Sequence, residues 1–291
     1  MSMAGDAVAE KPAPRRDVVH LRRDAASGVE AVTARFHGHA YDMHHHDEWL
    51  VGVTHDGVQD FFCRGARRQS TAGRVILIEP GERHDGQALR AGGFRYSMLY
   101  LPQDWLRDRM GGRDGPLGFR ATLADDRHLG AAIDRACRAV FGAASPLATD
   151  AALDDLAEGL RGHLGAAAPR PVPDGDPALA ERALDYLHAH AATPFGLDAL
   201  ARAVGAADRF QLARAFRRRF GTSPHACLVE LRLVRARALL RERVPPAEAA
   251  LMAGFSDQSH LGRWFRRAYG LTPAAYRRGR TDVPDGGAAL D

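Results

Sequence analysis

The amino-acid sequence predicts an α+β protein of more than one domain, in which a β domain with a helical extension precedes an all-helical domain. Short apolar runs separated by turn signals fill the first hundred residues, and apolar residues at helical spacing fill most of the remainder. A basic helical motif also occurs twice near the end of the chain. With 291 residues and 45% hydrophobic content, the chain is long enough for two buried cores.

The first part of the chain has the pattern of an antiparallel β domain. Residues 1–16 are rich in Pro and charge, and we expect them to be disordered. From Val18 to Leu101, runs such as EWLVGV, VILIEP and FRYSMLYLP alternate with DG, RG, AGG and PGE turn signals. We assign the β domain to residues 17–122.

The apolar period becomes helical after the β domain. Residues 123–164 are predicted to form two helices, with apolar faces that include Leu129, Ile133, Leu153 and Leu156. Residues 165–177, GAAAPRPVPDGDP, have the composition of a linker. An all-helical domain is expected over 178–280, followed by a disordered tail, 281–291.

The last domain contains an internal repeat. Its apolar positions Leu212, Phe216 and Phe220 recur 49 residues later as Leu261, Phe265 and Tyr269. Four-residue spacing places each set on one face of a helix, so the sequence predicts that they are core residues. Arginines fill the positions between them.

Each copy of the repeat reads as a helix-turn-helix unit. A first helix ends at a glycine, Gly205 or Gly254, which allows a tight turn. An aspartate three residues further on, Asp208 or Asp257, can cap the second helix. The sequence therefore predicts two second helices of equivalent position, each suited to lie in a major groove.

The stretch between the copies, SPHACLVELRLVRARALLRE, is predicted to be one long helix. Eighteen residues at about 1.5 Å each span about 27 Å, and successive turns of the major groove are about 34 Å apart. Such a helix can hold two reading helices over successive grooves. One face of this helix is predicted to contain Leu228, Leu231, Arg235, Ala238 and Leu239, with Arg232, Arg237 and Arg241 around it.

The charge distribution supports a nucleic-acid partner for the last domain. Residues 176–280 carry 18 Arg against 9 acidic residues, a balance of +9, whereas the rest of the chain carries 22 Lys and Arg against 27 acidic residues. A concentrated basic region beside an acidic remainder is typical of a DNA-binding module joined to a domain that does not contact DNA. From charge alone, a merely solvated arginine face is the alternative.

Residues 180–278 resemble the twin helix-turn-helix domain of the AraC/XylS family of transcription regulators. The segments that carry the resemblance are AGFSDQSHLGRWFRRAYGLTPAAYR and, between the copies, LRLVRARALL. GAADRF departs from the Ser-rich turn that is frequent in the family. The resemblance implies binding to double-stranded DNA, activation of transcription with RNA polymerase as a partner, and a homodimer with contacts in residues 123–164.

By the same resemblance, specific residues of the two second helices face DNA. Arg can donate two hydrogen bonds to guanine, Gln can pair with adenine, and small or aromatic side chains can touch a thymine methyl group. Arginines further along the helices are expected to contact phosphates and to set position rather than sequence preference. The expected base-reading residues are Phe210, Ala213, Arg214, Gln258, Ser259, Gly262 and Arg263, and the expected phosphate contacts are Arg217, Arg218, Arg266 and Arg267.

The β domain contains a histidine pattern similar to the two short motifs of cupin β-barrels. His44 and His46 form an H-x-H pair in DMHHHDEWLVGV, and His84 follows a Pro-Gly turn in GRVILIEPGERHDG. Regulators of this family commonly place a cupin-like barrel before their DNA-binding part. We therefore expect a small polar effector in the barrel, such as a sugar, an amino acid or another small carboxylate, held by His44, His46, Glu48, Arg83 and His84.

The same histidines leave a second interpretation open. Three imidazoles can hold Zn²⁺, Fe²⁺ or another divalent ion, so His44, His46 and His84 are candidate metal ligands. The glutamate that metal-dependent cupins carry four or five residues after H-x-H is replaced here by Leu50 and Val51. The alternative function is thus a cupin metalloenzyme or metal sensor fused to a DNA-binding module, while a regulator without a required cofactor is favoured over an enzyme.

Composition places the protein in a reducing compartment. Its three cysteines, Cys63, Cys137 and Cys227, are far apart and odd in number, which favours free thiols over disulfides or a zinc site. No apolar run approaches the roughly 20 residues of a membrane helix, and the chain start lacks the apolar stretch of a signal peptide. We expect a cytoplasmic protein without a membrane partner.

Overall fold

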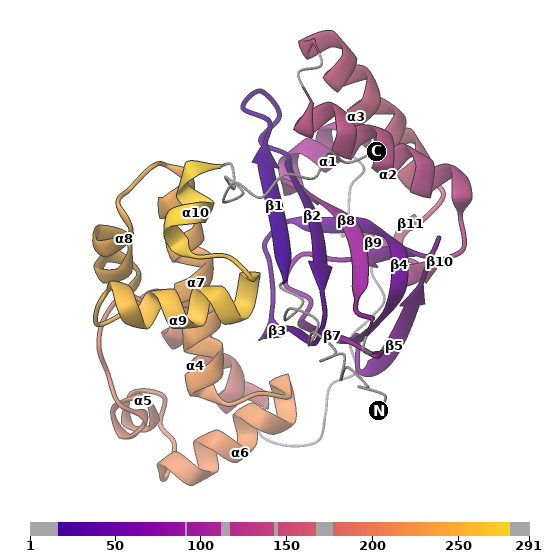
Figure 1. Ribbon diagram of the computed structural model, residues 1–291. Coiled ribbons are helices and arrows are strands. Elements are labelled where there is room, and N and C mark those ends of the chain that lie inside the picture. Colours follow the sequence, from indigo (N-terminus) through magenta and orange to yellow (C-terminus); the bar gives the residue numbers. More distant parts are fainter. Residues whose placement is uncertain (1–16, 91, 112–116, 143–144, 167–176, 280–291) are drawn as a thin grey trace, which may run out of the picture.

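The computed structural model describes residues 17–90, 92–111, 117–142, 145–166 and 177–279. It has the predicted α+β organisation, with a sheet-rich domain followed by a helical domain (Figure 1). Two groups of helices flank the sheet on opposite sides (Figure 1). The expectations for residues 1–16, for 281–291 and for most of the linker lie outside the described residues.

Strands begin at Val18 and fill the region to Leu101, as the sequence predicts. Over the described residues, nine strands join in one antiparallel sheet, in the order β1-β2-β8-β4-β6-β10. Off this path, β5 and β7 pair with β4, and β3 pairs with β7. A further pair, β9 and β11, forms a separate ladder. The strands are β1 (Val18–Arg23), β2 (Glu30–Phe36), β3 (His39–His44), β4 (Trp49–Cys63), β5 (Ala66–Thr71), β6 (Val75–Ile78), β7 (His84–Ala88), β8 (Phe94–Leu101), β9 (Leu117–Phe119), β10 (Leu123–Ala124) and β11 (Leu164–Ala166).

The 15-residue strand β4 holds the barrel together. Its first half pairs with β6 and β8, and its second half pairs with β5 and β7. Side chains from both halves, among them Leu50 and Phe61, belong to one buried cluster. The two parts of the sheet therefore enclose a common interior, which is the barrel lumen.

The central strands are buried on both faces, which explains why they read as continuous apolar runs. Leu50 packs in the lumen, whereas its neighbour Val51 packs on the outer face. The helices α1 (Gln103–Arg109), α2 (Arg127–Phe141) and α3 (Pro146–Leu160) supply the cover of that outer face. Trp105, Ile133 and Leu156 are examples of their contribution.

The predicted helical segment 123–164 contains α2 and α3, but its two ends are strands. Leu123–Ala124 pairs with β6, and Leu164–Ala166 pairs with β9. The short helix α1 was not predicted, because QDWLRDR is too short to show a helical period.

The C-terminal domain is entirely helical over the described residues 177–279. Its long helix has 18 residues and occupies the predicted stretch between the two repeats. The helices are α4 (Pro177–His190), α5 (Leu197–Ala203), α6 (Arg209–Phe220), α7 (Pro224–Arg241), α8 (Pro246–Ala253), α9 (Gln258–Tyr269) and α10 (Pro273–Arg278).

The buried face of α7 differs from the predicted one. Arg235 and Ala238 are exposed, whereas Arg237 is 5% exposed. The buried residues Leu233, Ala236, Arg237 and Leu240 follow the 3-4-7 spacing of one helix face. The prediction was wrong because it placed Arg235 rather than Arg237 on this face, where Arg237 pairs with Glu30 and Glu48 of the β domain.

The two helix-turn-helix units have different surroundings. The first unit, with α4, α5 and α6, forms its own buried cluster together with the start of α7. The second unit, with α8, α9 and α10, shares one buried cluster with the barrel lumen. The second unit is therefore the part of the helical domain that docks on the barrel.

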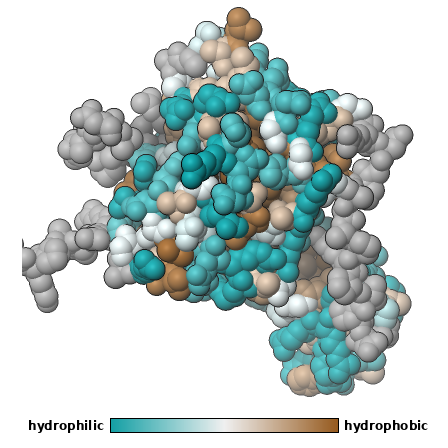
Figure 2. Space-filling model, turned by 90° about the vertical axis from the view of Figure 1, so that its right-hand side faces the viewer, coloured by the Kyte–Doolittle hydropathy of each residue, from teal (hydrophilic) through white to brown (hydrophobic). Residues whose placement is uncertain are grey.

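The side of the β domain that lies opposite α7–α10 is largely hydrophilic, with small, separate hydrophobic areas (Figure 2). Among the described helices, none is long and apolar enough to cross a membrane.

Candidate DNA-binding surface and barrel-mouth site

The helices α6 and α9 start and stop in the same way. The side chain of Asp208 accepts a hydrogen bond from the backbone N–H of Gln211 at 2.6 Å, and that of Asp257 accepts one from His260 at 2.7 Å. Both helices end at a glycine in the left-handed conformation. The predicted caps are confirmed, and each satisfies a backbone donor that the helix start leaves free.

The two predicted turn glycines also adopt the left-handed conformation. Gly205 has φ +74° and Gly254 has φ +93°, values that side chains with a Cβ rarely adopt. Their surroundings differ, however. A Cβ on Gly254 would lie 2.7 Å from the carbonyl oxygen of Ala191, whereas a Cβ on Gly205 would meet open space.

One face of each second helix is core and the opposite face is exposed. Leu212, Phe216, Leu261 and Phe265 are all 0% exposed, which confirms their prediction as core residues. Arg214 and Arg263 are exposed at corresponding positions of the two helices. Of the other residues expected to contact DNA, Phe210, Arg217, Arg218, Gln258, Ser259, Arg266 and Arg267 are exposed, and Ala213 and Gly262 are half-buried.

Arg267 differs from the other exposed arginines of α9, because it contacts the β domain. Its Nε lies 2.5 Å from a carboxylate oxygen of Asp42 on β3, and its guanidinium lies 5.3 Å from the ring centre of Trp264. In this arrangement Arg267 is held against the barrel. A phosphate would have to compete with Asp42 for it.

Arg237 of α7 is the centre of a buried ionic cluster between the two domains. Its guanidinium lies 2.7 Å from Glu30 and 2.6 Å from Glu48, both on the β domain. It also donates to the hydroxyl of Tyr276 at 3.0 Å and to Nδ1 of His46 at 3.1 Å. Burial favours the neutral carboxyl of Glu30, but Arg237 and neighbouring arginines outweigh this and lower its pKa to about 2. The pair stays ionised at neutral pH.

A second ionic contact joins the barrel rim to α7. Arg83 donates to a carboxylate oxygen of Glu230 at 2.6 Å, and Nδ1 of His45 lies 3.2 Å from the same carboxylate. Arg83 and Glu48 were expected to face an effector inside the barrel. The structure instead places both of them in ion pairs with α7.

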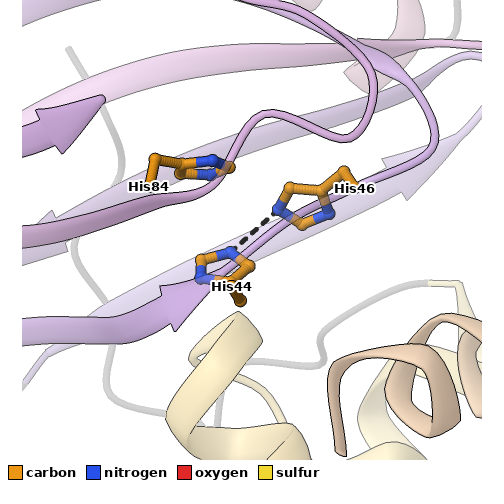
Figure 3. A group of neighbouring side chains, drawn as sticks. All are labelled: His44, His46 and His84. Carbon is orange, nitrogen blue, oxygen red and sulfur yellow. Dashed lines mark hydrogen bonds between the residues drawn. The ribbon is translucent and has the colours of Figure 1, made fainter. Parts of the chain in front are cut away.

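The three predicted histidines do come together, at the end of the barrel that faces the helical domain (Figure 3). His44 ends β3, His46 lies just before β4, and His84 begins β7. Nitrogen atoms of the three rings lie within 4.8 Å of one another, and Nε2 of His44 is 2.9 Å from Nε2 of His46. The ring of Tyr269 covers this group, with its centre 5.3 Å from the ring centre of His46. We call the three histidines and Tyr269 the barrel mouth.

Burial keeps the three rings neutral. It lowers the pKa of His84 to about 4, and it lowers the pKa of His44 and His46 well below the usual range, with further lowering by the neighbouring rings. Neutral imidazoles offer the lone pair that a metal ion or a hydrogen-bond donor requires.

The free space at the barrel mouth is small. The cavity bounded by the three histidines, Tyr100, Arg237 and Tyr269 measures about 30 Å³. One water molecule needs about 10–15 Å³ of such space, and typical organic ligands occupy pockets of about 300–1,000 Å³. Aromatic side chains that include Tyr41, Phe61 and Tyr96 line the same cavity on its lumen side.

Sequence reasoning missed the residues that connect the domains, above all Arg237 and Glu30. The signal for Arg237 is its place in the 3-4-7 apolar stripe of α7, where a charged residue needs a buried partner. No local pattern marks Glu30 as that partner, because it lies 207 residues away in the chain.

A sensor-like barrel joined to two helix-turn-helix units defines a transcription regulator. The family description "AraC-like ligand binding domain" matches residues 27–157, and "Helix-turn-helix domain" matches residues 200–279. The chain belongs to the AraC family of transcription regulators, as its sequence resemblance predicted.

A relative and two solved structures are similar to most of the chain. The uncharacterized HTH-type transcriptional regulator YbfI of Bacillus subtilis (strain 168) is 24% identical over 251 residues, which are 83% of this chain and 88% of that protein. The fold is similar to ToxT from Vibrio cholerae O395, with TM-score 0.52, 11% identity, and coverage of 92% of this chain and 98% of ToxT. The unsaturated fatty acid bound ToxT of Vibrio cholerae strain SCE256 has TM-score 0.54 and 12% identity, over 93% and 98% of the two chains.

Proposed function

We propose that α6 and α9 read two successive major grooves on one side of a DNA duplex. The observation that carries this proposal is that Arg214 and Arg263 are exposed at corresponding positions of two helices with the same caps. The connecting helix α7, with 18 residues, spans about 27 Å and suits the spacing of successive grooves.

The exposed residues divide into base readers and phosphate contacts. Near the start of each helix, Phe210, Ala213 and Arg214 in α6 and Gln258, Ser259, Gly262 and Arg263 in α9 are positioned to read bases. Arg217, Arg218 and Arg266 lie further along and would contact phosphates, and Arg267 would do so after leaving Asp42.

Selection of binding sites from random duplex DNA, with the full chain, tests this function. We expect a preferred sequence, and an affinity that falls steeply with salt because phosphate contacts release counterions. Arg263→Ala should relax preference at one base pair by roughly 1–3 kcal/mol, whereas the control Arg266→Ala should weaken all sequences about equally. Equal binding to all sequences by the unchanged chain would contradict a regulator that recognises an operator.

The β domain is proposed to control DNA binding through the docking of the second unit. A ligand shifts such an equilibrium only if it binds the docked and released arrangements unequally. The barrel mouth is suited to this, because its lining comes from both domains. The expected effector is small and polar. A sugar or amino acid would need the second unit to move, because the cavity measures only about 30 Å³.

The remaining features of the proposal follow from the family. The chain would act in the cytoplasm as an activator that contacts RNA polymerase, and as a homodimer through α2 and α3. Leu147, at the start of α3, is 79% exposed and is available for such a contact. Sedimentation of the full chain at several concentrations measures the dimer.

A cupin metalloenzyme fused to the same DNA-binding module is the weaker candidate. The positions where metal-dependent cupins carry a glutamate hold Leu50 and Val51, which pack in the lumen and on the outer face. Glu48, the glutamate nearest in sequence to these two positions, is paired with Arg237.

A further inference from the structure

The hydrogen bonds around the barrel mouth define which ring nitrogens carry hydrogen. Nδ1 of His44 lies 2.7 Å from the carbonyl oxygen of Asp42, and Nδ1 of His84 lies 3.0 Å from that of Glu82. A carbonyl oxygen can only accept, so both Nδ1 atoms carry hydrogen. The lone pairs of these two neutral rings are therefore on Nε2, inside the cluster.

His46 has the opposite arrangement. Its Nδ1 lies 3.1 Å from Nη1 of Arg237, and a guanidinium can only donate. Nδ1 of His46 thus accepts, and its Nε2 carries the hydrogen, which it donates to Nε2 of His44 at 2.9 Å (Figure 3). A continuous chain of hydrogen bonds runs from Arg237 in the DNA-binding domain through His46 and His44 to the backbone of β3.

We propose that His44, His46 and His84 bind one divalent transition-metal ion, and that this binding displaces Arg237 from His46. The nitrogen atoms already lie within 4.8 Å of one another, close enough to converge on one ion. The cavity that these histidines share with the barrel lumen measures about 30 Å³, which is room for an ion with about one or two water ligands. Imidazoles select Zn²⁺, Co²⁺, Ni²⁺, Cu²⁺ or Fe²⁺ over Mg²⁺ and Ca²⁺.

Metal binding and the Arg237 contact exclude each other, whichever nitrogen of His46 is the ligand. If Nε2 binds the metal, its hydrogen moves to Nδ1, where it faces an N–H of Arg237 at a distance of 3.1 Å. Two donors then oppose each other. If Nδ1 binds the metal, the ion takes the lone pair that Arg237 uses. His44 and His84 keep their tautomers, since Nε2 of each carries a lone pair. The lone pair of His44 becomes available to the ion once the hydrogen bond from Nε2 of His46 is broken.

The metal would therefore loosen the docking of the second helix-turn-helix unit. Arg237 keeps its ion pairs with Glu30 and Glu48 and its hydrogen bond to Tyr276. The domains therefore lose the contact between Arg237 and His46, and not the whole interface. The effect on DNA rests on the proposed function. If docking holds α9 against the barrel, metal and operator DNA should each strengthen binding of the other, typically by about 5- to 150-fold.

Titration of the metal-free full chain with Co²⁺ tests the site itself. We expect one Co²⁺ per chain, with the visible absorption of a nitrogen-ligated ion. His84→Ala should remove this absorption. The matched control is His45→Ala, which changes the middle histidine of the same HHH run, because the His45 ring faces Glu230 instead. The absence of one-to-one binding, or binding unchanged in His84→Ala, would overturn the proposal.

Histidine ¹⁵N spectra of the unchanged chain test the displacement of Arg237 without any substitution. Without metal we expect hydrogen on Nδ1 of His44 and His84, and on Nε2 of His46. Addition of diamagnetic Zn²⁺ should remove the hydrogen from Nε2 of His46, or show Nδ1 of His46 as the ligand. A His46 ring that keeps both its tautomer and its hydrogen bond to Arg237 in the zinc form would overturn the displacement.

DNA binding separates the failure of this inference from the failure of the proposed function. Affinity for a selected site should rise with Zn²⁺ in the unchanged chain and in His45→Ala, but not in His84→Ala. Metal binding with the predicted spectral change, but without any change in affinity for DNA, supports the metal site and contradicts control of DNA binding through docking.

Discussion

Arg237 illustrates, at the scale of single residues, how a charged side chain is accommodated in a protein interior. It is 5% exposed, and two carboxylates, a hydroxyl and an imidazole surround its guanidinium. Such a group persists only because its partners compensate for the loss of water. The stability of the interface therefore depends on this cluster as a unit.

Arg237→Met should destabilise the chain by about 3–5 kcal/mol, because it leaves Glu30 and Glu48 buried with one cation fewer. Urea unfolding of the full chain measures this difference. The control is Arg218→Ala, which removes an exposed arginine of α6 and should change stability by less than about 0.5 kcal/mol. Similar values for the two variants would contradict the buried cluster.

Glu30 should make stability depend on pH in the acid range. Its pKa in the folded chain is about 2, below the ordinary value of 4.5. The folded state binds the proton less tightly, so this contribution, roughly 3 kcal/mol, is complete above pH 4.5 and decreases as the pH falls toward 2. Unfolding free energies of the unchanged chain and of Glu30→Gln, measured between pH 6 and pH 3, should show a shallower acid decrease in the variant. Parallel curves would exclude Glu30 as the source.

Residue roles with a local cause could be predicted from the sequence. Leu212 and Phe265 are core residues because of their spacing, and the three barrel-mouth histidines follow from two short motifs. The partners of Glu48 and Arg83 could not be predicted, because both pair with residues of α7 that are at least 147 positions away.

At the scale of elements, two turns that look equivalent in sequence differ in their packing. Gly205 and Gly254 both have positive φ, but only Gly254 lies against the backbone near Ala191. The second unit is the more tightly packed of the two at this point, because its turn lies against the backbone that follows α4.

Gly254→Ala should therefore destabilise the chain more than Gly205→Ala. The Gly205 variant adds only left-handed strain, about 1 kcal/mol, because its Cβ meets open space. The Gly254 variant adds a clash at 2.7 Å with the carbonyl of Ala191, and the loss should exceed 2 kcal/mol. Thermal unfolding of the two variants compares them directly. Equal losses would mean that the turn of the second unit relaxes freely.

Element boundaries were predictable where a cap or a turn residue marks them. The aspartate caps and glycine ends of α6 and α9 are examples. The ladder of β9 and β11 was not predictable, because its strands have three residues each and lie more than 40 residues apart. The buried face of α7 depends on contacts with the other domain, and its sequence alone does not show them.

At the scale of the whole molecule, the second helix-turn-helix unit packs both within the helical domain and against the barrel. It completes the DNA-binding domain, and its side chains extend the buried core of the barrel. The pair of Arg267 with Asp42 joins the reading helix α9 directly to β3. Docking and the proposed reading of DNA thus use the same helix.

Asp42→Asn should strengthen DNA binding by up to about 5-fold, because it frees Arg267 from a partly exposed ion pair worth at most about 1 kcal/mol. Loss of a negative charge anywhere on the barrel also favours binding to DNA. The control is therefore Asp56→Asn, which removes the carboxylate that pairs with Arg35 on the β domain. Fluorescence anisotropy with a selected duplex compares the two. A gain of the same size in both variants would show that Asp42 acts only through net charge.

The most direct test of the account compares site selection by Arg214→Ala and Arg263→Ala, because one arginine lies on each reading helix. If α6 and α9 lie in successive major grooves, each variant should relax preference at its own base pair, and the two positions should be about 10 base pairs apart. Relaxation at the same position in both variants, or at neither, would contradict the central claim that this chain reads DNA with two helices held by α7.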